Sequence, residues 1–366
     1  MEGSLQLNGH KRRKITIYDI AMEIGISPTS VSFVLNGLAK QHRISDETAA
    51  KVISTAHRLG YAVNLKARGL RLSRSGLAGM ILPHYRNRFF AGLAEAFETE
   101  ARAHGLCPVV VSTQRDGAIE ASVIETLLAQ QVEFLFIAGV HDPDPLNVMC
   151  RKAGVASVNL DLPGREAPSV VSDNYGGAHA LTEHVARKLR DRGDPVADIF
   201  FFGGLTEDDA TAKRFQGFRD VLLTYGITLT DDMVDYCGYP PEMAAQSIAR
   251  RYSQLGRLPR GLFVNGVTSL EGLLQFAVTL PAHALDDIAV GSFDWDPFAA
   301  HLSFEVTMVR QNVENMIAEA FKLLEIPAQG ENPVVVVPTS FGRAGRGDGA
   351  GEDWRLNPVI AMSAPD

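Results

Sequence analysis

Residues 16–36 read TIYDIAMEIGISPTSVSFVLN and decide the fold of the N-terminal part of the chain. Thr16, followed three residues later by an acid, forms a capping-box variant that predicts the start of a helix. Gly25 is placed to end this helix in a left-handed turn. Ser27 is placed to cap a second helix whose first position is Pro28, where the missing N–H costs nothing. The stretch therefore predicts two short helices joined by a tight turn.

A third helix follows this pair. Ser45 is its predicted cap, residues 46–59 form the helix, and Gly60 closes it. We expect three of its side chains to face the other helices: Val52, Ile53 and Ala56. Three short helices with a tight turn between the first two form the architecture that places a helix in the major groove of DNA. Residues 15–63 are therefore predicted to be an all-α helix-turn-helix domain that binds double-stranded DNA.

The charge distribution supports this prediction. Residues 1–74 hold 12 Lys and Arg against 5 Asp and Glu, whereas residues 75–366 hold 23 against 38. A small basic part joined to a strongly acidic one concentrates phosphate affinity at one end of the chain. The basic run at residues 11–14, taken alone, is more typical of a solvated arm. Beside a capped helix-turn-helix, it indicates nucleic-acid binding.

Composition argues against several classes of protein. No apolar run approaches the roughly 18–20 residues that span a bilayer, and residues 1–8 lack the apolar core of a signal peptide. The three cysteines, Cys107, Cys150 and Cys237, are far apart and show neither metal-ligand spacing nor a disulfide framework. We expect reduced thiols in a cytoplasmic protein that has no membrane partner.

From residue 76 onward, strand-like and helix-like segments alternate. Apolar strands are predicted at 76–82, 108–112, 134–137 and 156–160, and again at 199–202, 234–237, 262–264 and 288–291. Helices are predicted at 89–103, 120–130, 178–190, 213–225, 242–253 and 269–279. Alternation of this kind indicates parallel sheets that helices cover on both faces.

Two such series in succession predict a two-lobed α/β body over residues 76–340, built on two doubly wound parallel sheets. In open α/β sheets, ligands bind beyond the carboxyl ends of the strands, so the predicted ligand site is the cleft between the lobes. Residues 341–366 are rich in Gly, Asp and Arg and lack periodicity, which predicts a mostly disordered tail.

The sequence carries no signature of catalysis. It contains no Gly-x-Gly-x-x-Gly, Gly-Lys-Ser/Thr or Gly-x-Ser-x-Gly motif, and its histidines lack metal-ligand spacing. We therefore expect no catalytic residue, no metal and no cofactor. An enzyme acting on sugars is the alternative, because two acids and an arginine in a cleft also suit acid–base chemistry. Turnover assays distinguish the two classes.

The chain has a helix-turn-helix at residues 15–63, a basic segment at 64–75 and a two-lobed body at 76–340. This order resembles the LacI/GalR family of bacterial transcription regulators over about residues 15–340. The motifs TIYDIA at 16–21, GIS at 25–27 and VLN at 34–36 match the family's DNA-binding head. The resemblance implies an allosteric repressor that binds a palindromic operator as a homodimer. The body of such a repressor is expected to be similar to that of periplasmic sugar-binding proteins. A periplasmic sugar-binding protein is therefore an alternative, but the DNA-binding head and the missing signal peptide argue against it.

The basic segment at residues 64–75 resembles the hinge helix of the same family. Asn64, Arg68 and Leu70 match the family's hinge pattern. The resemblance implies that Leu70 is wedged into the minor groove at the centre of the operator, where an apolar side chain unstacks a base step and kinks the duplex. The alternative is that Leu70 is an ordinary residue of a helix core.

The resemblance and the helix positions together give the side chains expected to contact DNA: Thr16, Tyr18, Ser27, Pro28, Thr29, Ser30, Ser32, Phe33, Asn36, Ser45, Asn64, Arg68 and Leu70. One departure from the family lies on the second helix, which offers no Arg for a bidentate pair with guanine. Phe33 is expected to project outward there, toward a thymine methyl group. The family's usual operator sequence therefore does not transfer to this chain.

Within the family, the connection at 36–45 and the motifs FGG at 202–204 and SFD at 292–294 resemble the fructose- and sucrose-type repressors. This resemblance favours fructose, a fructose phosphate or sucrose as the effector. A non-sugar metabolite such as a purine is the alternative.

A sugar site needs polar groups that pair with vicinal hydroxyls and an aromatic face against the C–H surface of the ring. The resemblance supplies both types of residue at strand ends and helix starts of the body. The expected effector-binding residues are Phe89, Phe90, Asp161, Arg214, Tyr239, Asn265 and Asp294.

Overall fold

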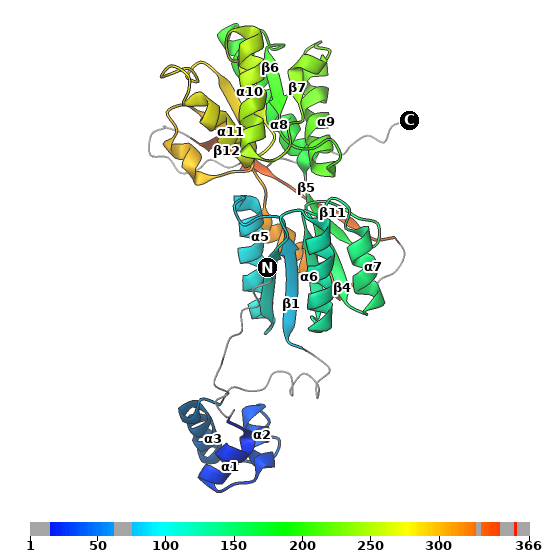
Figure 1. The fold of residues 1–366 in the computed structure, drawn as a ribbon, viewed down its shortest axis with the longest axis vertical. Helices are drawn as coiled ribbons and strands as arrows, with labels where there is room; N and C mark the ends of the chain where they lie inside the picture. Colours follow the sequence, from blue (N-terminus) through cyan, green and yellow to red (C-terminus); the bar gives the residue numbers. More distant parts are fainter. Residues whose placement is uncertain (1–14, 62–74, 327–330, 345–354, 357–366) are drawn as a thin grey trace, which may run out of the picture. The chain divides into compact units, whose positions relative to one another are not determined.

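The computed structural model describes residues 15–61, 75–326, 331–344 and 355–356. The chain divides into two compact units, Met1–Ser75 and Gly76–Asp366, which we call the head and the body. Each unit is taken by itself below (Figure 1). The hinge residues Asn64, Arg68 and Leu70 lie outside the described residues.

The head contains helices α1 (Ile17–Ile24), α2 (Pro28–Leu35) and α3 (Asp46–Leu59). The predicted caps are confirmed. The Thr16 N–H donates to Asp19 Oδ2 at 2.8 Å, and the hydroxyls of Ser27 and Ser45 accept from the N–H groups three residues on. Gly25 and Gly60 end α1 and α3 with φ of 71° and 69°, a left-handed conformation that glycine adopts without strain.

The head core differs from the prediction at one position of α3. Its buried apolar residues are Ile20, Ala21, Val31, Val34, Val52 and Ala56. The prediction that Ile53 faces inward is wrong, because this side chain is 48% exposed and Thr55 is buried instead. Residues 52, 55 and 56 follow the three-and-four spacing of one helix face, which residue 53 leaves.

Phe33, which is expected to project outward, does not belong to the apolar core of the head. Its ring is half-buried and stacks on the ring of His42, with centroids 3.4 Å apart and planes 6° from parallel. His42 belongs to the connection between α2 and α3, and the N–H of Leu38 in that connection donates to the Phe33 carbonyl at 2.8 Å. One face of the ring is therefore covered by protein.

The first lobe of the body is a six-stranded sheet in the order β11-β5-β4-β3-β1-β2, and all of its pairs are parallel. Its elements are β1 (Leu77–Leu82), α5 (Arg88–Ala103), β2 (Cys107–Ser112), α6 (Gly117–Ala129), β3 (Phe134–Ala138), α7 (Asp144–Lys152), β4 (Ala156–Leu160), β5 (Ser169–Ser172), α12 (Val313–Glu325) and β11 (Val334–Val337). Helices α5 and α12 bury one face of this sheet, and α6 and α7 bury the other.

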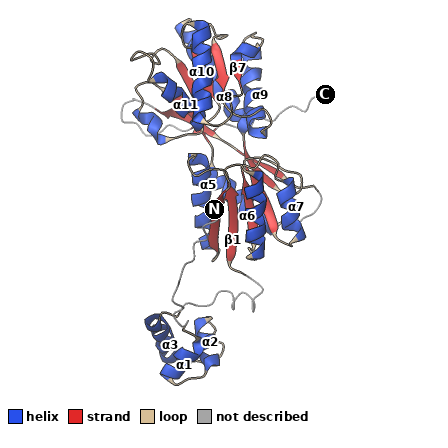
Figure 2. Ribbon diagram, in the orientation of Figure 1, coloured by secondary structure: helices blue, strands red, loops and turns tan. Residues whose placement is uncertain are grey.

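The second lobe is a seven-stranded sheet in the order β13-β12-β10-β9-β8-β6-β7. Its elements are α8 (Asn174–Arg192), β6 (Ile199–Phe202), α9 (Asp209–Thr224), η1 (Asp231–Met233), β7 (Val234–Asp235), α10 (Pro241–Leu255), β8 (Gly261–Val264), α11 (Val267–Ala277), β9 (Ala289–Phe293), η2 (Pro297–His301), β10 (Val306–Arg310), β12 (Ser340–Ala344) and β13 (Arg355–Leu356). Helices α8 and α9 cover one face, and α10 and α11 cover the other (Figure 2). The predicted pair of doubly wound sheets is confirmed.

The chain order of the lobes differs from two consecutive series. After β10 in the second lobe, the chain returns to the first lobe as α12 and β11, which pack on α5 and pair with β5. It then enters the second sheet again as β12, antiparallel to β10. Strands β12 and β13 also place residues 341–344 and 355–356 in the sheet, so the expectation of a disordered tail is wrong at those positions. The rest of 341–366 lies outside the described residues.

Candidate functional site

A cavity of about 710 Å³ lies between the two lobes of the body. Residues from both lobes line it: His84, Arg86, Asn87, Phe89, Phe90, Gln114, Arg115, Asp161, Leu205, Ala210, Arg214, Gly238, Tyr239, Pro240, Pro241, Glu242, Val267, Thr268, Glu271, Asp294, Asp296, Phe298 and Gln311. Six of the seven expected effector residues are among them. The volume falls within the range of small-molecule sites.

Arg214 is the buried cation of this cavity. It lies in the second turn of α9, where its Nε donates to Asn174 Oδ1 at 2.8 Å and its Nη1 donates to the Asn265 carbonyl at 2.6 Å. Its guanidinium also stacks on Phe293, with Cζ 3.9 Å from the ring centroid. Two of the five N–H groups are held by these bonds, so the orientation of the guanidinium is fixed while other N–H groups are left for a ligand.

Asp161 and Asp294 occupy equivalent places in the two lobes, directly after β4 and β9. Both have a left-handed backbone, with φ of 74° and 63°, and both are buried. Asp tolerates this conformation better than most residues, and such backbone strain clusters at binding sites. Gln311 Nε2 donates to Asp294 Oδ1 at 2.6 Å, whereas the described residues give the Asp161 carboxyl group no hydrogen-bond partner.

Burial raises the pKa of Asp161 from an ordinary value of 3.8 to about 7. The cations of Arg214 and Arg115 oppose this rise, and the carboxylates of Asp294 and Asp208 add to it. A carboxyl group that titrates near neutrality exchanges between accepting hydrogen bonds and donating one, which marks a functional position rather than a passive surface acid.

Aromatic side chains supply the apolar surface of the cavity. Phe89 and Phe90 begin α5, where the Asn87 side chain accepts from the Phe89 N–H at 2.9 Å, and their rings meet edge to face at a centroid distance of 5.0 Å. Tyr239, from the second lobe, donates its hydroxyl hydrogen to Asp208. The Tyr239 ring is covered by Arg115, whose Cζ lies 4.4 Å from the ring centroid.

Asn265 is the expected effector residue that the structure does not bring to the cavity lining. Its carbonyl accepts from Arg214, and its side-chain Nδ2 donates to Thr211 Oγ1 at 3.1 Å. Asn265 therefore stands behind Arg214 and supports it.

The sequence reasoning missed several lining residues, among them Arg115 and Gln311. Arg115 follows β2 at its carboxyl end, the same signal that pointed to Asp161, and was open to discovery on that ground. Gln311 follows β10, a strand that was not predicted, so no local signal marked it.

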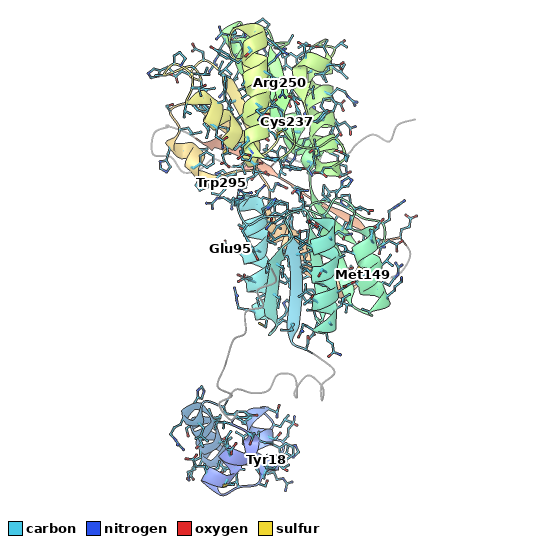
Figure 3. All side chains as sticks on the ribbon, in the orientation of Figure 1. Tyr18, Glu95, Met149, Cys237, Arg250 and Trp295 are labelled. Atoms are coloured by element: carbon cyan, nitrogen blue, oxygen red, sulfur yellow. The ribbon has the colours of Figure 1, made fainter. Side chains whose placement is uncertain are left out.

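In the head, the expected DNA-contacting residues that the structure describes all remain at least partly accessible. Tyr18, on α1, is 66% exposed (Figure 3). The hydroxyls of Ser27 and Ser45 cap helices, and the Asn36 side chain donates back to the Ser32 carbonyl at 2.5 Å. These three side chains therefore also shape the head.

Family comparisons bear on both units. The description "Bacterial regulatory proteins, lacI family" matches residues 16–64, which contain the helix-turn-helix, and "Periplasmic binding protein domain" matches residues 78–300. The chain belongs to the lacI family. The LacI/GalR resemblance is confirmed for the head and for the two-lobed body.

Relatives of this lacI-family chain are bacterial repressors. It is 46% identical over 193 residues to the ribitol operon repressor of Klebsiella aerogenes, covering 52% of this chain and 71% of that protein. It is 28% identical over 325 residues to the sucrose operon repressor of Klebsiella pneumoniae, covering 88% of this chain and 95% of that one.

Among solved structures, the lac repressor dimer bound to operator and the anti-inducer ONPF is similar, with a TM-score of 0.72. The likeness covers 95% of this chain and 100% of that one at 20% identity, and it shows the fold alone.

Within the described residues of this lacI-family chain, no helix is long and apolar enough to cross a membrane, and no group of His, Cys, Asp and Glu is arranged to hold a metal.

Proposed function

We propose that this chain is a cytoplasmic repressor that binds a palindromic operator as a homodimer and releases or engages it in response to a small neutral polyhydroxy compound, a sugar or a sugar alcohol. The observation that carries the ligand class is the lining of the cavity between the lobes. Two relatives of the chain are named for the ribitol operon and the sucrose operon, and ribitol and sucrose are both neutral polyhydroxy compounds.

The charge of the cavity favours a neutral ligand over a phosphorylated one. Five carboxylates line it, against three arginines, and one of those arginines is Arg214 with its two protein partners. A phosphate group placed among more carboxylates than cations meets net repulsion, which a low-dielectric cavity strengthens. Hydroxyl groups instead donate to carboxylates, so this lining suits a polyol.

Three groups are proposed as the polar contacts of the ligand. Asp161 has no hydrogen-bond partner among the described residues, and its carboxyl group faces the cavity. Asp294 is held on one oxygen by Gln311, which leaves the other oxygen for a hydroxyl. Arg214 donates through the N–H groups that its protein partners do not use. Phe89 and Tyr239 are proposed to cover the C–H surface of the ligand.

Control of DNA binding follows from coupling between this cavity and the head. Operator affinity requires two heads held at one half-site spacing, so a ligand that changes the angle between lobes of a dimer alters that affinity. The described DNA-contacting side chains and the hinge residues Asn64, Arg68 and Leu70 are proposed to carry the contact. A C2 dimer matches a palindromic site by symmetry.

A thermal-shift and calorimetric screen tests the ligand class. Ribitol, other pentitols, sucrose, fructose, fructose 1-phosphate and a purine are offered to the full chain. A ligand present at 100 times its Kd stabilises the folded state by about 2.7 kcal/mol. We expect stabilisation by a neutral polyol, and release or tightening of operator DNA in a mobility-shift assay at the same concentration.

The other outcomes correct the proposal in distinct ways. Stabilisation by fructose 1-phosphate alone contradicts the neutral class, and stabilisation by the purine alone supports the non-sugar alternative. Chemical conversion of any sugar in the sample identifies an enzyme.

A further inference from the structure

Asp208 is a buried carboxylate at the N-cap position of α9. It precedes α9, but its side chain makes no capping hydrogen bond to the first turn of that helix. The side chain is only 1% exposed. A carboxylate removed from water at this depth is costly unless other groups compensate it, so its partners explain its presence.

Two of these partners come from the opposite lobe. His141, after β3 of the first lobe, has Nδ1 3.1 Å from Asp208 Oδ1 and is placed to donate to it. Arg115, after β2 of the first lobe, has Nη1 3.8 Å from Asp208 Oδ2 and also donates to the Gly139 carbonyl at 3.2 Å. Asp208 itself belongs to the second lobe, so these contacts exist only while the lobes face each other as they do here.

The third partner links Asp208 to the ligand cavity. The Tyr239 hydroxyl donates to Asp208 Oδ2, and Arg115 covers the Tyr239 ring. Burial, with a smaller effect of the Asp208 charge, raises the pKa of Tyr239, which keeps its hydroxyl protonated as a donor. Asp208 thus holds the hydroxyl group of Tyr239, an aromatic residue of the cavity lining, without lining the cavity itself.

A second ion pair between the lobes has a different character. Arg88 Nε lies 3.1 Å from Asp296 Oδ2, and the Arg88 side chain is 53% exposed, much as that of His141 is 57% exposed. The two pairs differ in the carboxylate, because the Asp296 side chain is 17% exposed and that of Asp208 is 1% exposed, and solvent weakens an ion pair that it can reach. Among the cross-lobe pairs of the described residues, the buried anchor is Asp208.

We propose that Asp208 is a positioning residue for the ligand site that acts across the lobes. Arg115 and His141 of the first lobe close on its carboxylate, and that carboxylate fixes Tyr239 at the cavity wall. Closure of the lobes and the positioning of Tyr239 at the cavity wall therefore occur together. This inference rests on the proposed function only in taking the cavity as the ligand site.

His141 makes the inference testable, because it does not line the cavity. The hydrogen bond that a change at His141 removes is the one to Asp208. Asp209 provides a matched control: it also lies at the start of α9, but it pairs with Lys213 of its own helix at 3.1 Å. Asp209→Asn therefore removes the same charge from the same helix end without touching the first lobe.

The first experiment needs no ligand. Urea unfolding of the full chain is followed by circular dichroism for the wild type, Asp208→Asn, His141→Ala and the double variant. We expect the double variant to unfold at the same midpoint as Asp208→Asn alone, because both changes remove one contact. Asp209→Asn combined with His141→Ala should show additive shifts. Additive shifts in the Asp208 cycle overturn the cross-lobe role.

The second experiment measures affinity for ribitol and sucrose by calorimetry. Asp208→Asn should weaken binding by about tenfold, near the lower end of what the loss of a hydrogen bond to a charged group gives. His141→Ala should weaken it less, by about threefold, because Asp208 keeps Arg115 and Tyr239 as partners, and Asp209→Asn should bind as the wild type does. Unchanged affinity in His141→Ala, in a wild type that binds, overturns the positioning role. If the wild type binds neither probe nor any other polyol, the proposed function fails, and the urea cycle alone decides whether Asp208 joins the lobes.

Discussion

Asp161→Asn isolates the cost of placing a charged carboxylate in the ligand cavity. The side chain is buried, has no hydrogen-bond partner among the described residues, and titrates at about 7 instead of 3.8. Asn keeps the shape and tolerates the φ of 74° at this position, but it carries no charge at any pH. The variant therefore differs from the wild type chiefly in one ionisation.

The sign of the effect follows from linkage. Between pH 4 and 7 the unfolded chain has released the Asp161 proton while the folded chain retains it, so wild-type stability falls as pH rises through this window. At about 1.4 kcal/mol per pH unit, the wild type should lose about 2–3 kcal/mol relative to Asp161→Asn between pH 5 and 8, with most of the loss below pH 7.

Urea unfolding of the full chain at pH 5, 6, 7 and 8, with the wild type and the variant side by side, measures this difference. Other titrating groups are common to both proteins and cancel in the comparison. Asp142→Asn, which removes an exposed acid after the neighbouring strand β3, is the control for the loss of one negative charge. Parallel pH profiles for the wild type and Asp161→Asn would refute the reasoning.

Three further predictions concern the hinge, the cavity and the packing of the body. Leu70→Ala should weaken operator binding by about 2–4 kcal/mol in mobility-shift titrations and leave non-specific DNA binding unchanged; equal losses in both contradict the wedge. Arg214→Lys should weaken polyol binding by about 1.5–3 kcal/mol in calorimetry, because one ammonium group cannot replace a planar guanidinium. Arg219→Lys, at an exposed position of the same helix, is the control and should leave polyol binding unchanged. Gly217→Ala should lower the free energy of unfolding by about 1–3 kcal/mol, because its Cβ would lie 2.5 Å from a backbone carbonyl oxygen of α8; Gly117→Ala, with open space around its Cβ, is the neutral control.

The sequence alone determined the head and the character of the body. The caps of α1, α2 and α3 are contacts between residues three or four apart, so Thr16, Ser27 and Ser45 were readable without knowledge of any other part of the chain. The apolar strands were equally local, since parallel strands covered on both faces must be apolar throughout. Family motifs added the order of the two units.

Strand ends also pointed to most of the ligand cavity. The family resemblance pointed to Asp161 and Asp294, and both follow strands, in agreement with the rule that ligands bind beyond the carboxyl ends of parallel strands. Asn265 also follows a strand and was expected to bind the effector, but its place at a strand end did not suffice. The tertiary structure turns the Asn265 carbonyl toward Arg214, and Asn265 does not line the cavity.

Only the tertiary structure decided which residues meet across large separations in the chain. The return of α12 and β11 to the first sheet, and the bond from Gln311 to Asp294, depend on a strand that no local pattern announced. Asp208 was not singled out by the sequence, since the helix was predicted to begin at residue 213, and its partners His141 and Arg115 lie 67 and 93 positions away in the other lobe. Helix caps and apolar periodicity are determined by residues within one or two helical turns. A site between two lobes is determined by how the lobes pack, and the sequence encodes that packing only through the sum of its long-range contacts.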